Sequence, residues 1–349
     1  MTDVTSVDVL VIGAGPAGLR AAEVLAAAGR EVLVLERHEE IGPKVCAGGL
    51  TPKAQALVEE LGLPGSEGLT SVGYATFTGS APFVIDEARC RIRTVSRRAL
   101  GRHLAERTRR AGADVRAGVA ASHVDLEGRT VAAGGRTIRY RTLIGADGSE
   151  SRVRHALGLP CPRAYFACEY NVSRARLEPL RVECDPVELA AGYFWVFPHA
   201  DYTSIGCGAP KRQVAPRELH RILDRHMQQL GFAPDAAPFE GATIELHYPG
   251  TTFRGGVHLV GDAAGLASPL TAEGIYPALV SGEEVARRIL EPKYAMPRLR
   301  RWLHLKRQHH WLSGMLASLA LRKALLPVFA RLGRMKAARR AVADFYLAG

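Results

Sequence analysis

Apolar and polar positions follow two different patterns along the chain, and together they predict a mixed α/β protein. Short apolar runs that end in glycine turns are typical of strands buried on both faces of a parallel sheet. Such runs occupy residues 9–12, 143–146 and 257–260, and a fourth apolar run at 32–35 ends at Glu36. Apolar residues at helical spacing predict helices at 52–61, 95–111 and 216–230, and helices dominate after residue 274.

The remaining patterned segments predict antiparallel sheet. Residues 71–85 and 163–249, apart from the helix within the latter, show the alternation and turn residues of extended strands. Short extended runs separated by Gly or Asp turns predict a β-meander with strands around Val115, Val124, Val131 and Ile138.

This order of elements predicts two interleaved domains and a C-terminal extension. A chain of 349 residues is long enough for that division. The opening strand–helix–strand unit is typical of a Rossmann-like nucleotide-binding domain, which we expect to be built from residues 1–70, 90–160 and 250–290. We expect an antiparallel β-sheet domain for the substrate from residues 71–89 and 161–249, and a basic helical segment from residues 291–349.

The first strand runs directly into a glycine-rich turn. Gly13 permits the tight turn, Gly15 lets the backbone approach a pyrophosphate, and Gly18 lets the next helix pack against the strand. Glu36 ends the second strand, where a carboxylate accepts hydrogen bonds from a ribose diol. The same carboxylate would repel a 2′-phosphate, which argues against NADP as the ligand of this site.

A second glycine motif follows an apolar strand near the other end of the chain, at Gly261-Asp262. One such motif predicts only a nucleotide. Two motifs so far apart suggest a ligand that is long enough to be held at both of its ends. The pair therefore predicts FAD.

Positive charge is concentrated in the C-terminal segment. The net charge is +11, and from Lys293 onward Asp344 is the one acid among many Lys and Arg residues. No nucleic-acid recognition motif accompanies this segment, so we expect an anionic membrane surface, a phosphorylated lipid or an acidic redox protein as its partner. Its apolar residues fit either ordinary packing or an interfacial amphipathic surface: Leu312, Met315, Leu316, Leu319, Leu325, Leu326 and Phe329.

The cysteines indicate reduced thiols in the cytoplasm. The chain has six, without C-x-x-C or zinc-type spacing and with no signal peptide ahead of them, and no metal site is predicted. They are Cys46, Cys90, Cys161, Cys168, Cys184 and Cys207. The longest apolar window, 311–321, is too short to span a membrane, so we expect a cytoplasmic protein, with peripheral membrane contact left open.

Three further segments are distinctive: Asp147-Gly148, the Lys-Val-Cys-Ala-Gly-Gly-Leu run at 44–50, and Tyr-x-Trp-x-Phe-Pro at 193–198 followed by Gly-x-Gly at 206–208. With these segments the chain resembles the geranylgeranyl reductases, within the flavoproteins that share the p-hydroxybenzoate hydroxylase fold. The resemblance covers about residues 5–290. Two departures are Ala272 and Ala47, where the family often has glycine.

The resemblance implies an FAD-dependent reductase that hydrogenates C=C bonds of an isoprenoid chain, with NADPH or reduced ferredoxin as a transient electron donor. Asp262 would accept a hydrogen bond from the ribityl chain, and the N–H groups of Gly274 and Ile275 would face the flavin N1/O2 edge. Arg97 would lie along the FAD, with Arg98 as a competing choice. The full implied cofactor set is Gly13, Gly15, Ala17, Gly18, Glu36, Arg37, Cys46, Ala47, Gly48, Gly49, Arg97, Val119, Asp147, Gly148, Gly261, Asp262, Gly274 and Ile275.

The aromatic residues of the Tyr-x-Trp-x-Phe-Pro segment alternate along one strand and so share one face. Tyr193, Trp195 and Phe197, with Pro269, would line an apolar slot for a prenyl chain, although core packing is the ordinary role of such a stripe. Tyr193 and Cys46 are the candidate proton donors.

Three other functions are compatible with the same scaffold. A hydroxylase would use FAD with dioxygen. A halogenase is suggested by the superficial likeness of 192–198 to the Gly-Trp-x-Trp-x-Ile-Pro motif, although Tyr193 stands at its first Trp. An electron carrier to a quinone usually adds an iron–sulfur module, for which the chain has no cysteine cluster.

Overall fold

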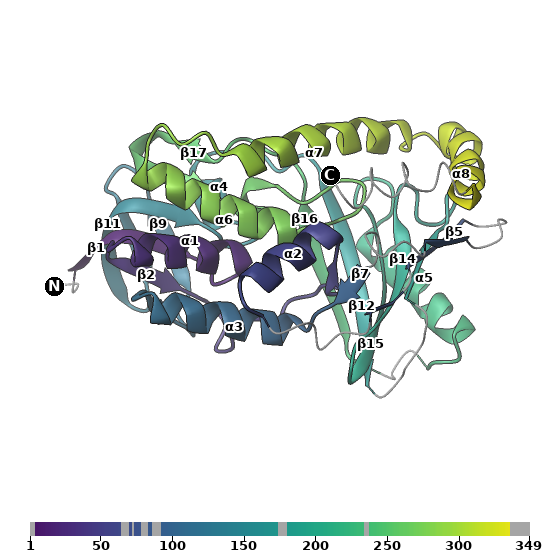
Figure 1. The fold of residues 1–349 in the computed structure, drawn as a ribbon, viewed down its shortest axis with the longest axis horizontal. Coiled ribbons are helices and arrows are strands. Elements are labelled where there is room, and N and C mark those ends of the chain that lie inside the picture. The colour runs from purple at the N-terminus through teal and green to yellow at the C-terminus, as the bar shows by residue number, and fades with distance from the viewer. Residues whose placement is uncertain are drawn as a thin grey trace.

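The computed structural model of the chain describes residues 4–63, 70–71, 73–77, 83–85, 92–173, 180–233 and 237–335. Two large sheets and the helices around them account for most of these residues (Figure 1). The sheet that contains the first strand is mainly parallel, with the order β17–β18–β11–β1–β2–β8, and β10 and β9 continue from β11. Its strands are β1 (Val4–Ile12), β2 (Val32–Leu35), β8 (Asp114–Arg116), β9 (Ala121–Asp125), β10 (Thr130–Ala133), β11 (Arg136–Gly145), β17 (Thr252–Phe253) and β18 (Val257–Leu259).

Helices cover the parallel sheet, which is why β2, residues 9–12 of β1 and residues 143–145 of β11 are apolar or small and buried. In Figure 1, α1 (Pro16–Ala27) lies between α3 (Arg97–Arg110) and α6 (Ile275–Leu290). The α1–α6 contact is very close, because a Cβ on Gly282 would lie 2.2 Å from the carbonyl oxygen of Ala17. This contact holds the first glycine turn beside a helix from the far end of the sequence.

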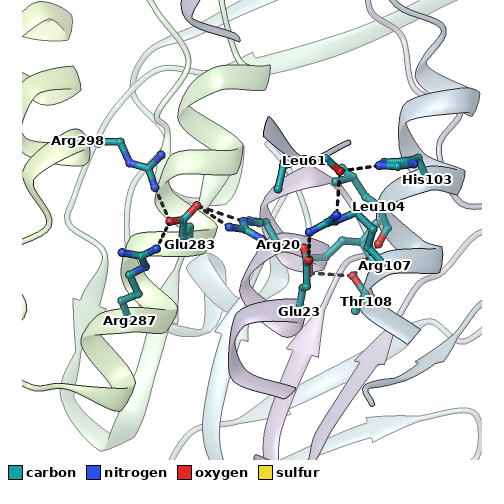
Figure 2. Close-up of polar contacts among 11 residues, drawn as sticks. Arg20, Glu23, Leu61, His103, Leu104, Arg107, Thr108, Glu283, Arg287 and Arg298 are labelled. Carbon is teal, nitrogen blue, oxygen red and sulfur yellow. Dashed lines mark hydrogen bonds and ion pairs between the residues drawn. The ribbon is translucent and has the colours of Figure 1, made fainter. Parts of the chain in front are cut away.

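A buried carboxylate fixes α6 to its neighbours (Figure 2). Glu283 is 2% exposed and accepts hydrogen bonds from Arg20 on α1, with Nη2 at 2.8 Å, and from Arg298 on α7 (Pro297–Met315). Arg287 lies 2.8 Å from the same carboxylate. Burial alone would raise the pKa of Glu283, but the hydrogen bond and charge of Arg20 and the charges of the other arginines outweigh it and lower that pKa.

The second large sheet has seven strands in the order β16–β12–β15–β14–β13–β5–β6. It is antiparallel except where β13 pairs with β5. Its strands are β5 (Gly73–Phe77), β6 (Phe83–Ile85), β12 (Ala164–Ser173), β13 (Arg181–Cys184), β14 (Tyr193–Pro198), β15 (Tyr202–Pro210) and β16 (Phe239–Glu245). Phe194 and Val196 pack with α5 (Pro216–Gln229) on one face, so Tyr193, Trp195 and Phe197 point to the other.

Smaller elements connect the two sheets. The strands β3 (Gly49–Leu50), β4 (Thr70–Ser71) and β7 (Ile92–Thr94) form a three-stranded sheet beside α2 (Pro52–Glu60). The short helices α4 (Arg152–Ala156), η2 (Arg254–Gly256) and η3 (Gly261–Ala264) follow strands of the parallel sheet. In Figure 1, α7 runs from α6 toward the antiparallel sheet and leads to α8 (Leu319–Arg334).

The predicted fold class is confirmed, with a Rossmann-like parallel sheet, a separate antiparallel sheet and C-terminal helices. The expected meander is wrong at Val115, because β8 pairs with β2 in parallel; only β9, β10 and β11 form the antiparallel run. The domain boundaries stay a prediction. Cys90, the 336–349 tail and the side chain of Phe329 lie outside what the structure describes.

In the C-terminal segment, part of the apolar pattern packs internally. Leu312, Leu316 and Leu326 are buried in one cluster with Leu270. Within the described residues, none of the helices combines the length and apolar character that a bilayer crossing requires.

Candidate functional site

A cavity of about 360 Å³ extends from the first glycine turn to the C-terminal helices. This volume lies in the usual range for small-molecule sites, and most of the lining side chains are apolar. Of the residues predicted from the sequence, the lining includes Gly15, Ala17, Cys46, Ala47, Gly48, Gly49, Arg97, Gly148, Tyr193, Trp195, Phe197, Gly261, Asp262, Gly274 and Ile275. It does not include Gly13, Gly18, Glu36, Arg37, Val119, Asp147 or Pro269.

The three glycines of the first turn have three different surroundings. Gly13 has φ +103, and a Cβ there would lie 2.3 Å from the Ala146 carbonyl oxygen. A Cβ on Gly18 would lie 2.0 Å from the Gly13 carbonyl oxygen, so this glycine is required by packing. A Cβ on Gly15 would meet nothing within 4 Å and would project into space beside the cavity. The turn therefore has room for a pyrophosphate where the sequence predicts one.

The residues around Glu36 support the turn from outside the cavity. Glu36 accepts the backbone N–H groups of Ala14 at 2.9 Å and His38 at 3.0 Å. The N–H of Val119 bonds the Glu36 carbonyl at 2.8 Å, while Arg37 Nε contacts the His38 ring at 3.0 Å on the surface. Glu36 thus connects the end of β2 to the glycine turn.

Asp147 and Gly148 have separate roles in their turn. The Asp147 carboxylate accepts the Ser151 hydroxyl and the N–H groups of Arg152 and Val153, so it holds the start of α4. Burial raises the pKa of Asp147 despite these hydrogen bonds. Gly148 lines the cavity with φ +80, and a Cβ there would meet nothing within 4 Å.

The second glycine motif places Asp262 and the start of α6 at the cavity. Lys44 Nζ lies 2.6 Å from Asp262 Oδ2 across the space between the two motifs. No side chain caps the N-terminus of α6 at Gly274 or that of α1 at Gly15. Both helix ends therefore present a partial positive charge to the cavity.

The two arginines at the start of α3 differ in direction. Arg97 lines the cavity, and its Nε atom is buried without a hydrogen bond to the described residues. Arg98 lies at the surface, 3.0 Å from Glu40. An orphaned guanidinium N–H fits an anionic ligand, so the geometry supports Arg97 of the two.

The 46–49 loop closes one wall of the cavity by close backbone contact. The N–H of Cys46 donates to Glu169 Oε1 at 2.8 Å. A Cβ on Gly48, which has φ +73, would lie 2.4 Å from the Val95 carbonyl oxygen, and one on Gly49 would lie 2.5 Å from the Phe197 ring. These glycines let the loop lie against β7 and β14.

The aromatic stripe of β14 forms the neighbouring wall. The Tyr193 hydroxyl donates to the Thr271 carbonyl oxygen at 2.7 Å, and burial raises the pKa of Tyr193. Trp195 Nε1 donates to Ser204 Oγ, whose hydroxyl donates to Glu169. Each polar tip is therefore bonded, and the ring faces are left to line the slot. The predicted contact from Pro269 is taken instead by Leu270.

Comparison with known proteins agrees with this geometry. A family model described as an FAD binding domain matches residues 6–282. Digeranylgeranylglycerophospholipid reductase 1 of Methanopyrus kandleri is 33% identical over 81% of this chain and 81% of its own length. Geranylgeranyl diphosphate reductase of Rhodobacter capsulatus is 32% identical, over 80% of this chain and 74% of its own.

The chain belongs to the FAD-binding geranylgeranyl reductase family. A solved geranylgeranyl bacteriochlorophyll reductase-like protein from Thermoplasma acidophilum shares its fold, with a TM-score of 0.79, 23% identity and coverage of 99% of this chain and 98% of that one. The chain is thus an FAD-dependent oxidoreductase. The open cradle at Gly15, the two uncapped helix ends and the orphaned Arg97 N–H all fit the cofactor.

One departure from the family pattern has a structural cost in this reductase. Ala272 has φ +52, a left-handed conformation that favours glycine. Its neighbour Glu273 lines the cavity, accepts the Thr51 hydroxyl, and lies 3.2 Å from Lys53 Nζ in an ion pair without hydrogen-bond geometry. Burial raises the pKa of Glu273, while Lys53 and Thr51 act in the opposite direction. No local pattern in the sequence indicates the Glu273–Lys53 pair.

Helix α7 also supports the reductase site, although it lies beyond the residues that the family model matches. Trp302 Nε1 donates to the Leu266 carbonyl oxygen at 2.9 Å, and Lys306 Nζ donates to that of Ala267 at 2.5 Å. His309 Nδ1 lies 2.9 Å from Ser268 Oγ. Burial lowers the pKa of Lys306 to about 7. Trp302, Lys306 and His309 lie at helical spacing, which indicates that they share one face of the helix. The spacing alone does not indicate that this face contacts residues 266–268.

Proposed function

We propose that the chain reduces C=C bonds of an isoprenoid chain that lies along β14. The observation that carries this proposal is one continuous cavity whose lining joins the FAD-binding turns to the Tyr193, Trp195 and Phe197 stripe. Two curated relatives, 33% and 32% identical to this chain, bear the names of reductases of geranylgeranyl groups, which supports the same substrate class. Bound FAD supplies a hydride from its reduced ring.

The protein's own contribution is to exclude water and to supply a proton. An isolated alkene accepts hydride poorly, so the second carbon must receive a proton as the first receives hydride. Of the two candidates, the Tyr193 hydroxyl is engaged with the Thr271 carbonyl oxygen. The Cys46 sulfur accepts the N–H of Gly48 at 3.4 Å, and this leaves its S–H available. We therefore favour Cys46 as the donor, with Tyr193 as a positioning residue.

We also propose that the substrate arrives from a membrane surface. Several apolar side chains on α7 and α8 are exposed, among them Trp311 at 69%, and the same helices carry exposed basic residues such as Lys323. Leu319, Leu321 and Val328 on α8 are also exposed, as is Met335 directly after that helix. An apolar surface among cations suits an anionic bilayer surface. Liposome flotation with anionic and neutral vesicles tests this contact.

The electron donor is proposed to be NADPH or a reduced ferredoxin, each binding transiently, because the sequence has no second Rossmann fingerprint. Stopped-flow bleaching of the bound flavin by each donor distinguishes them. A donor that bleaches the flavin no faster than buffer is excluded.

The reaction itself is tested with chemically reduced protein under argon. Incubation with geranylgeranyl diphosphate should add the mass of two hydrogen atoms per reduced bond, and a Cys46→Ser variant should slow this conversion more than Tyr193→Phe does. Unchanged masses across several prenyl donors contradict the proposal. Product that forms only with dioxygen indicates a hydroxylase instead.

A further inference from the structure

A single buried guanidinium lies at the α8 end of the cavity. Arg322 is 6% exposed and lines the cavity. Its Nε donates to the Pro186 carbonyl oxygen at 3.0 Å, and its Nη1 donates to the carbonyl oxygens of Leu316 at 2.8 Å and Ala317 at 3.1 Å. These contacts hold the side chain in place through Nε and Nη1.

No counter-charge accompanies this guanidinium. Among the described residues, no carboxylate lies within ion-pair distance of Arg322, and Nη2 makes no hydrogen bond. Burial lowers the pKa of Arg322, but a guanidinium stays protonated in proteins. A buried charge without a partner is costly unless a ligand supplies the opposite charge.

Most other charged side chains that line the cavity have partners of opposite charge, unlike Arg322. Lys44 is paired with Asp262, and Glu273 with Lys53. Arg97 shares the lack of a carboxylate partner within the described part of the chain, and the family resemblance implies that it lies along the FAD. By the same reasoning, Arg322 indicates a second anion at the other end of the cavity.

The position of α8 separates this second anion from the cofactor. In Figure 1, α8 lies at the end of the molecule opposite β1 and β2, against β5. Arg322 bonds the Leu316 carbonyl oxygen, and the Leu316 side chain packs in one apolar cluster with Leu326 and Ala191, which also line the cavity. A prenyl chain along β14 would therefore have one end toward the FAD turns and the other toward Arg322.

We propose that Arg322 binds the phosphate of the substrate's head group and so selects phosphorylated isoprenoids over neutral ones. This inference rests on the proposed function. The two free N–H groups of Nη2 match a pair of phosphate oxygens. The phosphate belongs either to a prenyl diphosphate or to a prenylated glycerophospholipid, and both offer the same oxygens.

The competing interpretation is that Arg322 only holds the end of α7 by bonding its last carbonyl groups. Both interpretations expect a loss of stability when the side chain is shortened. Only head-group binding expects an effect that depends on the charge of the ligand. The experiment therefore compares ligands with the same chain and different heads.

The holoenzyme is titrated with geranylgeranyl diphosphate and with geranylgeraniol, and the dissociation constants are read from tryptophan fluorescence. Arg322→Met should weaken diphosphate binding roughly 10- to 100-fold, the effect of losing charge-assisted hydrogen bonds, and leave the alcohol within about twofold. Arg322→Lys should restore part of the loss. Arg217→Met, which removes an exposed charge from α5 on the other face of the antiparallel sheet, should change neither constant.

A separate measurement uses the wild-type protein, in case Arg322→Met does not fold. Inorganic pyrophosphate should compete with geranylgeranyl diphosphate and not with geranylgeraniol. Digeranylgeranylglycerophospholipid in vesicles provides a second phosphate ligand. The source of the phosphate is the ligand, diphosphate or glycerophospholipid, whose dissociation constant increases in Arg322→Met.

Equal weakening of both geranylgeranyl ligands, or of neither, would overturn the assignment. Competition by pyrophosphate against the alcohol would do so as well. Because binding is read without turnover, a protein that discriminates between the heads but reduces neither supports the Arg322 site and contradicts the proposed reaction.

Discussion

The two ends of the cavity recognise their ligands by different means. At the FAD end, the cradle expected for the pyrophosphate is built from backbone, and it depends on the absence of side chains at Gly13, Gly15 and Gly18. At the α8 end, the contacts are made by side chains such as Trp195 and Arg322 on elements whose backbones are bonded elsewhere. Gly13 and Gly18 cannot gain a side chain without disturbing the fold, whereas a cavity-lining side chain can be replaced while its backbone stays in place.

The largest expected difference is between Gly18→Ala and Gly49→Ala. The Cβ at position 18 would meet the Gly13 backbone at 2.0 Å, whereas the one at position 49 would meet the Phe197 ring, which can move. Gly18→Ala should lower the free energy of unfolding by about 3 kcal/mol or more and give colourless protein. Gly49→Ala should remain yellow and lose prenyl reduction. Denaturant titration measures the free energy of unfolding of each variant, and flavin absorbance measures its FAD content. A Gly18→Ala protein that is yellow and as stable as the wild type would contradict the expected difference between the two positions.

Next in size is Glu283→Gln, which removes the carboxylate shared by three arginines. We expect a loss of about 2–3 kcal/mol near neutral pH, below the full value for a buried pair because Arg287 and Arg298 are partly solvated. The folded pKa of Glu283 lies below its ordinary value of 4.5, so its stabilisation is present above that pH and disappears as the pH falls through the folded value. The difference between the two proteins should shrink in acid. Glu106→Gln, in an exposed pair, is the control and should cost under about 0.5 kcal/mol.

Gly15→Ala separates ligand binding from folding. The added methyl group meets nothing within 4 Å in the protein, so the melting temperature of the protein without FAD should not change. It would crowd a pyrophosphate, and we expect FAD affinity to fall roughly 10- to 100-fold, as overpacking by one methyl does elsewhere. Gly314→Ala, with the same open surroundings on α7, should leave FAD affinity unchanged. Equal FAD affinity in both variants would contradict the proposal that Gly15 makes room for the pyrophosphate.

On the β14 wall of the cavity, Tyr193→Phe should have a smaller effect. It removes one hydrogen bond to the Thr271 carbonyl oxygen, worth about 1 kcal/mol of unfolding free energy, and should leave FAD affinity as it is. The pH profile of prenyl reduction should also keep its shape if Tyr193 only positions the loop. Loss of a profile limb in this variant would make Tyr193 the proton donor.

The smallest expected effect is a gain from Ala272→Gly. Relief of the φ +52 conformation outweighs the added freedom of glycine in the unfolded chain, so stability should rise by about 0.5–1 kcal/mol. Differential scanning calorimetry measures the change. A lower melting temperature would mean that the alanine methyl has a packing role.

The same contrast explains what the sequence could predict. The glycine turns and the strands before them were predictable because backbone approach leaves few alternatives to glycine. The stripe of β14 followed from the twofold alternation of a strand, which puts Tyr193, Trp195 and Phe197 on one face.

Contacts between distant segments were not predictable in this way. Nothing local distinguishes β8 from a meander strand, since its parallel pairing with β2 depends on the helices between them. Lys44 meets Asp262, and Lys53 meets Glu273, only because the chain folds back on itself. Arg322 is one arginine in a basic tail, and its burial is visible only in three dimensions.

The close approach of Gly282 to Ala17, together with the hold of α7 on residues 266–268, has a consequence for biosynthesis. The glycine turn leaves the ribosome early, but α6 and α7 follow only when most of the chain has been translated. At about 5–20 residues per second, this delay lasts on the order of ten to fifty seconds. A nascent chain therefore has the first glycine turn but not yet α6 and α7. FAD can bind to the complete site only in the last stage of translation or after release.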